Sequence, residues 1–211
     1  MAPTANPTIR TARRLTLAVL LSLATAPLIA QVLAQTAKWP EKPIRLVVGF
    51  APGGFTDVLA RLIGQKLSER LGQPVIVENK AGAAGTLGAD LVAKAVPDGY
   101  TLLLGHSNSN AVAPALYPRL PYQVLRDFTP IIRVATTPLL LTINPNVAAK
   151  DVASFVALAK SKPDGLSFAS SGSGSSQHLA AARFMLATQT QMTHVPYKGS
   201  GQAIVDLLSG N

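Results

Sequence analysis

Apolar residues recur along the chain with two different periods, and their alternation predicts an ordered series of strands and helices. Short apolar runs rich in β-branched residues indicate buried strands, whereas apolar residues three or four positions apart indicate helices. The predicted strands cover residues 44–50, 75–77, 101–104, 136–143, 166–169 and 193–195. The predicted helices cover residues 56–71, 86–95, 108–116, 151–159, 176–186 and 202–208. Strands that alternate with helices predict an α/β fold with mainly parallel sheets.

Turn-forming residues divide this pattern into two parts. Gly72 and the Pro97-Asp98-Gly99 turn separate elements within the first part. The alternation of strands and helices restarts around Asn144-Pro145-Asn146, which marks a candidate domain boundary. We therefore expect one unit over residues 35–143 and a second over residues 144–211.

The first 34 residues have the pattern of an export signal. Arg10, Arg13 and Arg14 precede a largely apolar stretch from 15 to 29, and small or tolerated residues end at Ala34. A membrane anchor is the alternative, but it needs about 20 apolar residues, and Pro27 and Gln31 interrupt this run. We expect a signal peptide over residues 1–34 and a periplasmic protein, with the Sec or twin-arginine route left open.

Composition and charge exclude several classes of function. The chain has no cysteine and three histidines, so neither a disulfide framework nor a metal site is expected. The net charge of +9 falls to +6 without the three arginines of the signal segment, and the remaining basic residues are scattered. A nucleic-acid-binding protein would concentrate them on one face. A mild positive excess instead suits a protein that attracts small anions.

Four loops that follow predicted strands are rich in glycine and hydroxyl groups. The candidate ligand-binding residues in and beside these loops are Ala51, Pro52, Gly53, Gly54, Phe55, Thr56 and Asp57; His106, Ser107 and Asn108; Ser170, Ser171, Gly172, Ser173, Ser175 and His178; and Tyr197, Lys198 and Gly199. Ligands of parallel sheets bind beyond the carboxyl ends of the strands, where helix N-termini favour anions. Ordinary helix caps and tight turns are the alternative for any single loop. Four together predict a pocket for a ligand with more than one carboxylate.

Two motifs have the outline of catalytic or cofactor-binding loops. Residues 105–109 resemble a G-x-S-x-G nucleophile elbow around Ser107, but Ser109 replaces the closing glycine. A serine hydrolase using Ser107, with Asp206 and His178 or His194, stays an alternative. Residues 82–88 read G-x-x-G-x-x-G, which is not the dinucleotide fingerprint. We expect a structural loop there, no catalytic residue and no cofactor.

Several motifs, in order from residue 39 to the end of the chain, carry a family resemblance. They are Trp39-Pro40-Glu41-Lys42-Pro43-Ile44, Phe50-Ala51-Pro52-Gly53-Gly54, Leu71-Gly72-Gln73-Pro74-Val75, Pro97-Asp98-Gly99-Tyr100-Thr101-Leu102, Phe168-Ala169-Ser170-Ser171-Gly172, His178-Leu179-Ala180 and His194-Val195-Pro196-Tyr197-Lys198-Gly199. The chain resembles the Bug receptors, the substrate-binding proteins of tripartite tricarboxylate transporters.

The resemblance implies a type II periplasmic-binding-protein fold whose two lobes close on a small carboxylate. Residues 35–143 would belong to the first lobe and residues 144–211 to an incomplete second lobe, since the family continues for roughly another third. Carboxylate contacts would come from 51–57 on one lobe and 170–178 on the other. The implied partners are membrane permease subunits, and we expect a monomer. A ligand-sensing module for a signalling system is the alternative.

Phe55 departs from the family pattern, in which a small residue is more usual at this position. Its ring would narrow the pocket or stack on an aromatic acid. The resemblance therefore does not predict citrate as the ligand.

The signal pattern predicts that the mature protein starts near Gln35, because cleavage after Ala34 would follow the apolar segment. N-terminal sequencing of protein from the periplasmic fraction measures this directly. Retention of Met1 in that material would contradict the prediction.

Overall fold

The first sheet is built around a central strand that is apolar except at Arg45. The computed structural model describes residues 39–211. The strand order is β2-β1-β3, all parallel, with Ile44 opposite Val75 and Leu46 opposite Leu102. The three strands are β1 (Ile44–Val48), β2 (Val75–Asn79) and β3 (Thr101–Leu104). A central parallel strand reads as a continuous apolar run because helices cover both of its faces.

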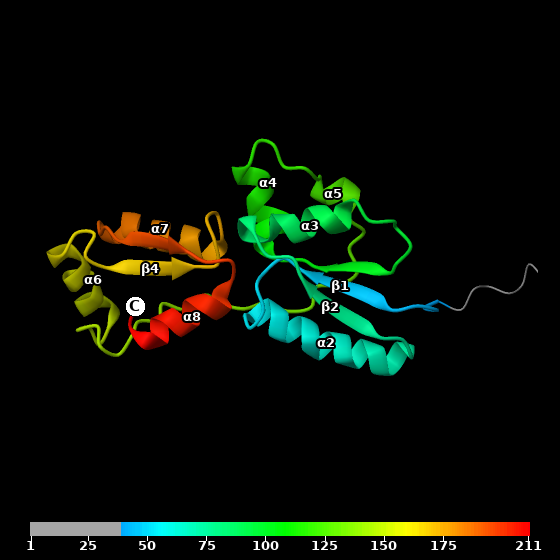
Figure 1. The fold of residues 1–211 in the computed structure, drawn as a ribbon. Helices are drawn as coiled ribbons and strands as arrows, with labels where there is room; N and C mark the ends of the chain where they lie inside the picture. Colours follow the sequence, from blue (N-terminus) through cyan, green and yellow to red (C-terminus); the bar gives the residue numbers. More distant parts are fainter. Residues whose placement is uncertain (1–38) are drawn as a thin grey trace, which may run out of the picture. The chain divides into compact units, whose positions relative to one another are not determined.

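Two helices supply that cover, one on each face of the sheet (Figure 1). They are α2 (Phe55–Leu71) and α3 (Thr86–Ala93). Leu46, Val48 and Phe50 alternate along one face of β1 and pack with Ala60 of α2 in the core. The strand predictions for this sheet and the prediction of both helices are confirmed.

The chain after β3 is helical in short pieces. The predicted helix over 108–116 begins as a single π-helical turn, Asn108–Val112, and continues as α4 (Ala113–Leu116). A further short helix, α5 (Val124–Asp127), was not predicted. Tyr122 is buried just before α5, and its hydroxyl donates to the Ser109 carbonyl at 2.7 Å.

A second, two-stranded parallel sheet holds the C-terminal elements. Its strands pair from Ser167 with Thr193 to Ser170 with Pro196. Asp151 starts the first helix of this part through a capping box with Ser154. The elements are α6 (Val152–Ser161), β4 (Ser167–Ser170), α7 (Ser176–Thr188), β5 (Thr193–Pro196) and α8 (Ser200–Ser209).

The predicted strand over residues 136–143 is wrong. This segment has neither helix nor strand, and Leu139, Leu140 and Leu141 are exposed. A strand forms only where its backbone N–H and C=O groups pair with a neighbour, and no described strand lies alongside. The apolar run at 136–143 therefore shows that the segment is hydrophobic, but it does not predict whether a partner strand pairs with it.

Asn144, at the predicted boundary, links the start of the second part to its last helix. Its side-chain amide donates to the Leu207 and Leu208 carbonyls at 2.8 and 3.3 Å. Its side-chain oxygen accepts the Asn146 N–H at 2.8 Å. One buried amide thus shapes the turn and satisfies two of the last carbonyls of α8.

The export signal predicted for residues 1–34 lies outside the described residues. Within 39–211, no helix combines the length and apolar character that a bilayer crossing requires.

The glycines of the G-x-x-G-x-x-G motif bring the end of β1 against the start of α3. A Cβ at Gly88 would lie 2.8 Å from the Gly49 Cα, and a Cβ at Gly49 would lie 2.6 Å from the Gly85 carbonyl oxygen. These neighbours are backbone atoms, which cannot move aside without shifting the strand. The prediction of a structural loop at 82–88 agrees with this packing.

Replacing Gly88 by alanine should destabilise the fold by about 1–3 kcal/mol, because the new methyl overpacks against the backbone of β1. Gly64→Ala in α2 is the matched control, since its Cβ would meet Val77 at an ordinary 3.5 Å. Alanine there should stabilise by up to about 1 kcal/mol through helix propensity. Chemical denaturation of both variants checks the pair, and an equal effect would contradict the packing argument.

Candidate functional site

The strand order of the first sheet determines where a crevice for the site forms. The chain leaves β1 towards β2 on one side, and β3 lies on the other side of β1. Loops that leave neighbouring strands in opposite directions open a crevice at the carboxyl end of the sheet, where ligands of such folds bind. The loops after β1 and β3 meet there, and the Phe50 and His106 rings contact edge to face at 5.2 Å.

Asp57 holds the loop between β1 and α2 in shape. Its carboxylate is 3% exposed and accepts from the Gly53 N–H at 3.0 Å, the Arg61 guanidinium at 3.0 Å and the Asn79 amide at 2.9 Å. Burial alone would raise the pKa of Asp57, but the bonds from Arg61, Gly53 and Asn79 outweigh it and lower the pKa. The carboxylate is therefore ionised and fully engaged with the protein.

Asn108 joins the loop after β3 to the first turn of α7. The side chain is completely buried, and its oxygen accepts the Ser176 N–H at 2.9 Å. That bond fixes the orientation of the amide, so Nδ2 is a donor, and it has no hydrogen-bond partner among the described residues. A buried donor without a partner is costly, and such groups often mark a place for water or ligand.

His106 and Ser107 lie beside Asn108 but do not form a catalytic triad. The His106 Nδ1 accepts the Asn108 N–H at 3.2 Å and lies 3.3 Å from the Ser107 hydroxyl. Burial is the main cause that lowers the pKa of His106. Within residues 39–211, no Asp or Glu hydrogen-bonds to the His106 ring to orient it as a base.

The loop between β4 and α7 is the serine–glycine loop, residues 170–175. Ser175 caps α7 by accepting the His178 N–H at 3.3 Å. The Ser171 hydroxyl donates to the Gln177 side-chain oxygen at 2.8 Å. Ser173 is exposed, and its carbonyl accepts from the Tyr117 hydroxyl at 3.1 Å. Most of this loop is therefore ordered by bonds to the first turn of α7 and to Tyr117.

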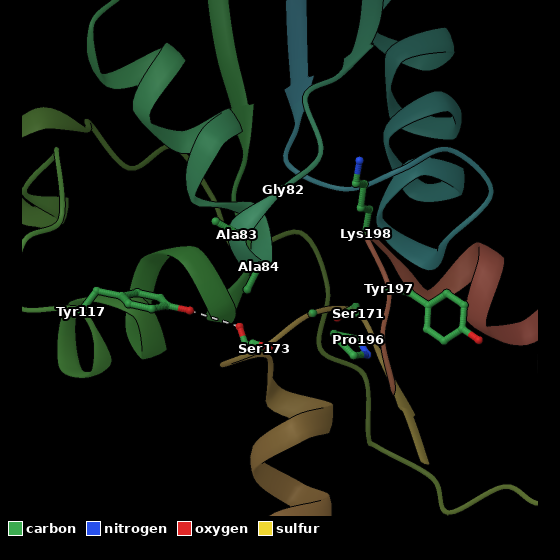
Figure 2. Close-up of a pocket in the computed structure, with 10 residues that line it drawn as sticks. Gly82, Ala83, Ala84, Tyr117, Ser171, Ser173, Pro196, Tyr197 and Lys198 are labelled. Atoms are coloured by element: carbon green, nitrogen blue, oxygen red, sulfur yellow. Dashed lines mark hydrogen bonds between the residues drawn. The ribbon is translucent and has the colours of Figure 1, made fainter. Parts of the chain in front are cut away.

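The loop after β5 approaches the loop after β1 very closely. The Lys198 carbonyl accepts the Ala51 N–H at 3.1 Å, and a Cβ at Gly199 would lie 3.1 Å from that nitrogen. The Tyr197 hydroxyl donates to Asp206 at 2.6 Å, which raises the pKa of the phenol. In Figure 2 its ring points away from Ser171 and Ala84.

A pocket of about 270 Å³ lies where these loops meet (Figure 2). No acidic residue lines it, and Lys198 is its one charged residue. The lining residues are Gly82, Ala83, Ala84, Tyr117, Ser171, Gly172, Ser173, Pro196, Tyr197 and Lys198.

Five of the predicted site residues line this pocket, and the other fourteen do not. The five are Ser171, Gly172, Ser173, Tyr197 and Lys198. The predicted residues outside the lining are Ala51, Pro52, Gly53, Gly54, Phe55, Thr56 and Asp57, together with His106, Ser107, Asn108, Ser170, Ser175, His178 and Gly199. Phe55 is 51% exposed at the start of α2 and does not narrow this pocket.

Sequence reasoning missed the wall formed by Gly82, Ala83 and Ala84. Ala83 and Ala84 have φ values of 46° and 53°, in the left-handed region that alanine rarely adopts. Strained residues of this kind cluster at binding sites. The run of glycines around them was the available signal. Tyr117 and Pro196 offered none, because only the folded chain brings them to the pocket.

Comparison with known proteins places this geometry in a family. The model of the tripartite tricarboxylate transporter family receptor matches residues 59–211. Protein BugT of Bordetella pertussis is 44% identical over 189 residues, which are 89% of this chain and 57% of BugT. The chain thus spans somewhat more than half the length of this curated relative.

Solved structures of similar proteins support the same family. The chain is similar to R. palustris Rpa4515 with adipate, at 38% identity and a TM-score of 0.77 over 80% of this chain and 56% of that one. MatC from Rhodopseudomonas palustris, with bound malate, is 38% identical with a TM-score of 0.76, over 82% and 58%. These likenesses confirm the predicted α/β periplasmic-binding-protein fold and the Bug resemblance. The chain belongs to the family of tripartite tricarboxylate transporter receptors.

Proposed function

We propose that the protein is a non-enzymatic, periplasmic solute-binding receptor that captures a small carboxylate between two lobes. The observation that carries this function is the chemistry of the pocket wall. It offers hydroxyl and backbone groups and the Lys198 ammonium, and no carboxylate lines it. A wall with one cation and no anion favours an anionic ligand.

The size of the pocket favours a short ligand. Ligand pockets commonly enclose about 300–1,000 Å³, and this one, at about 270 Å³, falls at the lower end. Ser171 and Lys198 lie on different parts of its wall (Figure 2). A short dicarboxylate would engage both, one carboxylate at each. Two similar proteins, solved with adipate and with malate, bind ligands of this class.

Membership of the receptor family supports delivery of the ligand to a transporter. The two lobes would be residues 35–143 and 144–211, and closure would bury the ligand between them. The receptor would act as a monomer in the periplasm, exported by the predicted signal peptide, and pass its ligand to membrane permease subunits. Titration calorimetry of the full-length protein against malate, adipate and citrate tests the proposal, and failure of every carboxylate to bind would refute it.

Ser171→Ala should weaken dicarboxylate binding by roughly tenfold. The Ser171 hydroxyl now donates to neutral Gln177, and a bond to a charged ligand would be stronger by about 1.4 kcal/mol. Calorimetry with the dicarboxylate that binds the wild type measures the loss. Ser161→Ala, on the exposed end of α6, is the control and should bind as the wild type does.

Lys198→Met should weaken dicarboxylate binding by at least about tenfold, because it removes the cation of the pocket wall. The loss should be smaller for a monocarboxylate of similar length, and Lys198→Arg should restore part of the affinity. Lys160→Met, exposed on α6, controls for net charge. An equal loss in both methionine variants would mean that Lys198 acts only through the overall charge.

A further inference from the structure

His178 lies in the first turn of α7, directly after the serine–glycine loop. Its Nδ1 accepts the Gly174 N–H at 3.1 Å. A ring nitrogen that accepts carries no proton, so neutral His178 has its proton on Nε2. The bond therefore ties the loop to α7 only while Nδ1 is unprotonated.

A second histidine is stacked on the first. The His178 and His194 ring centroids lie 4.0 Å apart with the rings within 5° of parallel, and the Phe168 ring stacks beside both, at 4.8 Å from His194 and 6.2 Å from His178. Phe168 and His194 are directly opposite each other in β4 and β5. The stack thus connects α7 to both strands of the second sheet.

His194 reaches the same loop through a serine. Its Nε2 lies 2.7 Å from the Ser170 hydroxyl. The Ser170 oxygen in turn accepts the Gly172 N–H and donates to the Gly172 carbonyl, both at 3.1 Å. The two rings therefore hold the loop at Gly172 and Gly174, on either side of the exposed Ser173. Gly172 and Ser173 are part of the pocket wall.

A proton on His178 would remove one of these attachments. Protonated Nδ1 becomes a donor that faces the Gly174 N–H, another donor, so the bond is lost. Burial and then the nearby His178 lower the pKa of His194, which disfavours a proton on that ring. The groups facing the pair are Phe168, Ser170 and Gly174, and no described acidic or basic side chain bonds to either ring.

We propose that His178 is a positioning residue that holds the serine–glycine loop in its ligand-binding conformation only while the imidazole is neutral. The claim that His178 affects carboxylate binding rests on the proposed function. The claim that His178 holds the loop rests on the loop geometry alone. Carboxylate affinity then falls when the imidazole takes up a proton. A histidine that touched the ligand would do the reverse, because a cation strengthens anion binding.

Nuclear magnetic resonance of the ligand-free, full-length protein tests the structural part. Between about pH 8 and about pH 5, the range in which histidine titrates, the imidazole nitrogens of His178 and the Gly174 amide are followed together. We expect an unprotonated Nδ1 at the upper end and a Gly174 amide shift that follows the His178 titration. A protonated Nδ1 there, or a Gly174 amide that stays constant, would overturn the proposal.

Calorimetry with adipate and with malate tests the binding part in the wild type and in His178→Asn. The asparagine oxygen can accept the Gly174 N–H and does not titrate. Wild-type affinity should fall by up to about tenfold per pH unit as the pH is lowered across this range, whereas His178→Asn should bind almost equally at both ends of the range. His178→Leu, which lacks an acceptor, should bind weakly throughout.

Two calorimetric results would contradict the proposed role of His178. Tighter wild-type binding in acid, or an unchanged pH dependence in His178→Asn, would overturn the positioning role. If the Gly174 amide follows His178 but no carboxylate binds at any pH, the proposed function fails while the control of the loop by His178 stands.

Discussion

No side chain separates the end of β1 from the start of α3, and the pocket depends on that contact. Gly49, Gly85 and Gly88 let two backbones approach to distances that any Cβ would prevent. The same approach holds Gly82, Ala83 and Ala84 at the carboxyl end of the sheet, where they form one wall of the pocket. The opposite wall comes from the loops after β4 and β5. A packing constraint in the first sheet thus decides where a ligand can lie.

The polar groups around this site fall into two sets according to their partners. Asp57 and the Tyr197 hydroxyl are engaged with protein groups, so they shape loops rather than wait for a ligand. The Asn108 Nδ2 and the Lys198 ammonium have no hydrogen-bond partner among residues 39–211. Both are donors. The two groups without a protein partner are therefore hydrogen-bond donors, which an anionic ligand requires.

The sequence predicted most of the fold because burial leaves a periodic trace along the chain. The central strand β1 and the helix α2 follow directly from their apolar patterns. The failure at 136–143 has a physical cause, since hydrophobicity does not reveal whether a partner strand exists. The serine–glycine loop was found from its composition, but the bonds of Ser171 to Gln177 and of His178 to Gly174 depend on local geometry that composition does not encode. Tyr117 reaches the pocket through tertiary contacts alone.

The left-handed alanines restrict how this receptor can change during evolution. At Ala83 and Ala84 the backbone tolerates glycine, and a β-branched or bulky residue would be a severe outlier. Mutation can therefore widen this wall of the pocket, whereas only the few larger side chains that tolerate this conformation, such as Asn or Asp, can fill it. New ligand preferences arise more easily elsewhere in the lining, at positions such as Tyr117, Pro196 and Lys198, which do not have a positive φ. Backbone conformation therefore limits substitutions on one side of the site more than on the other.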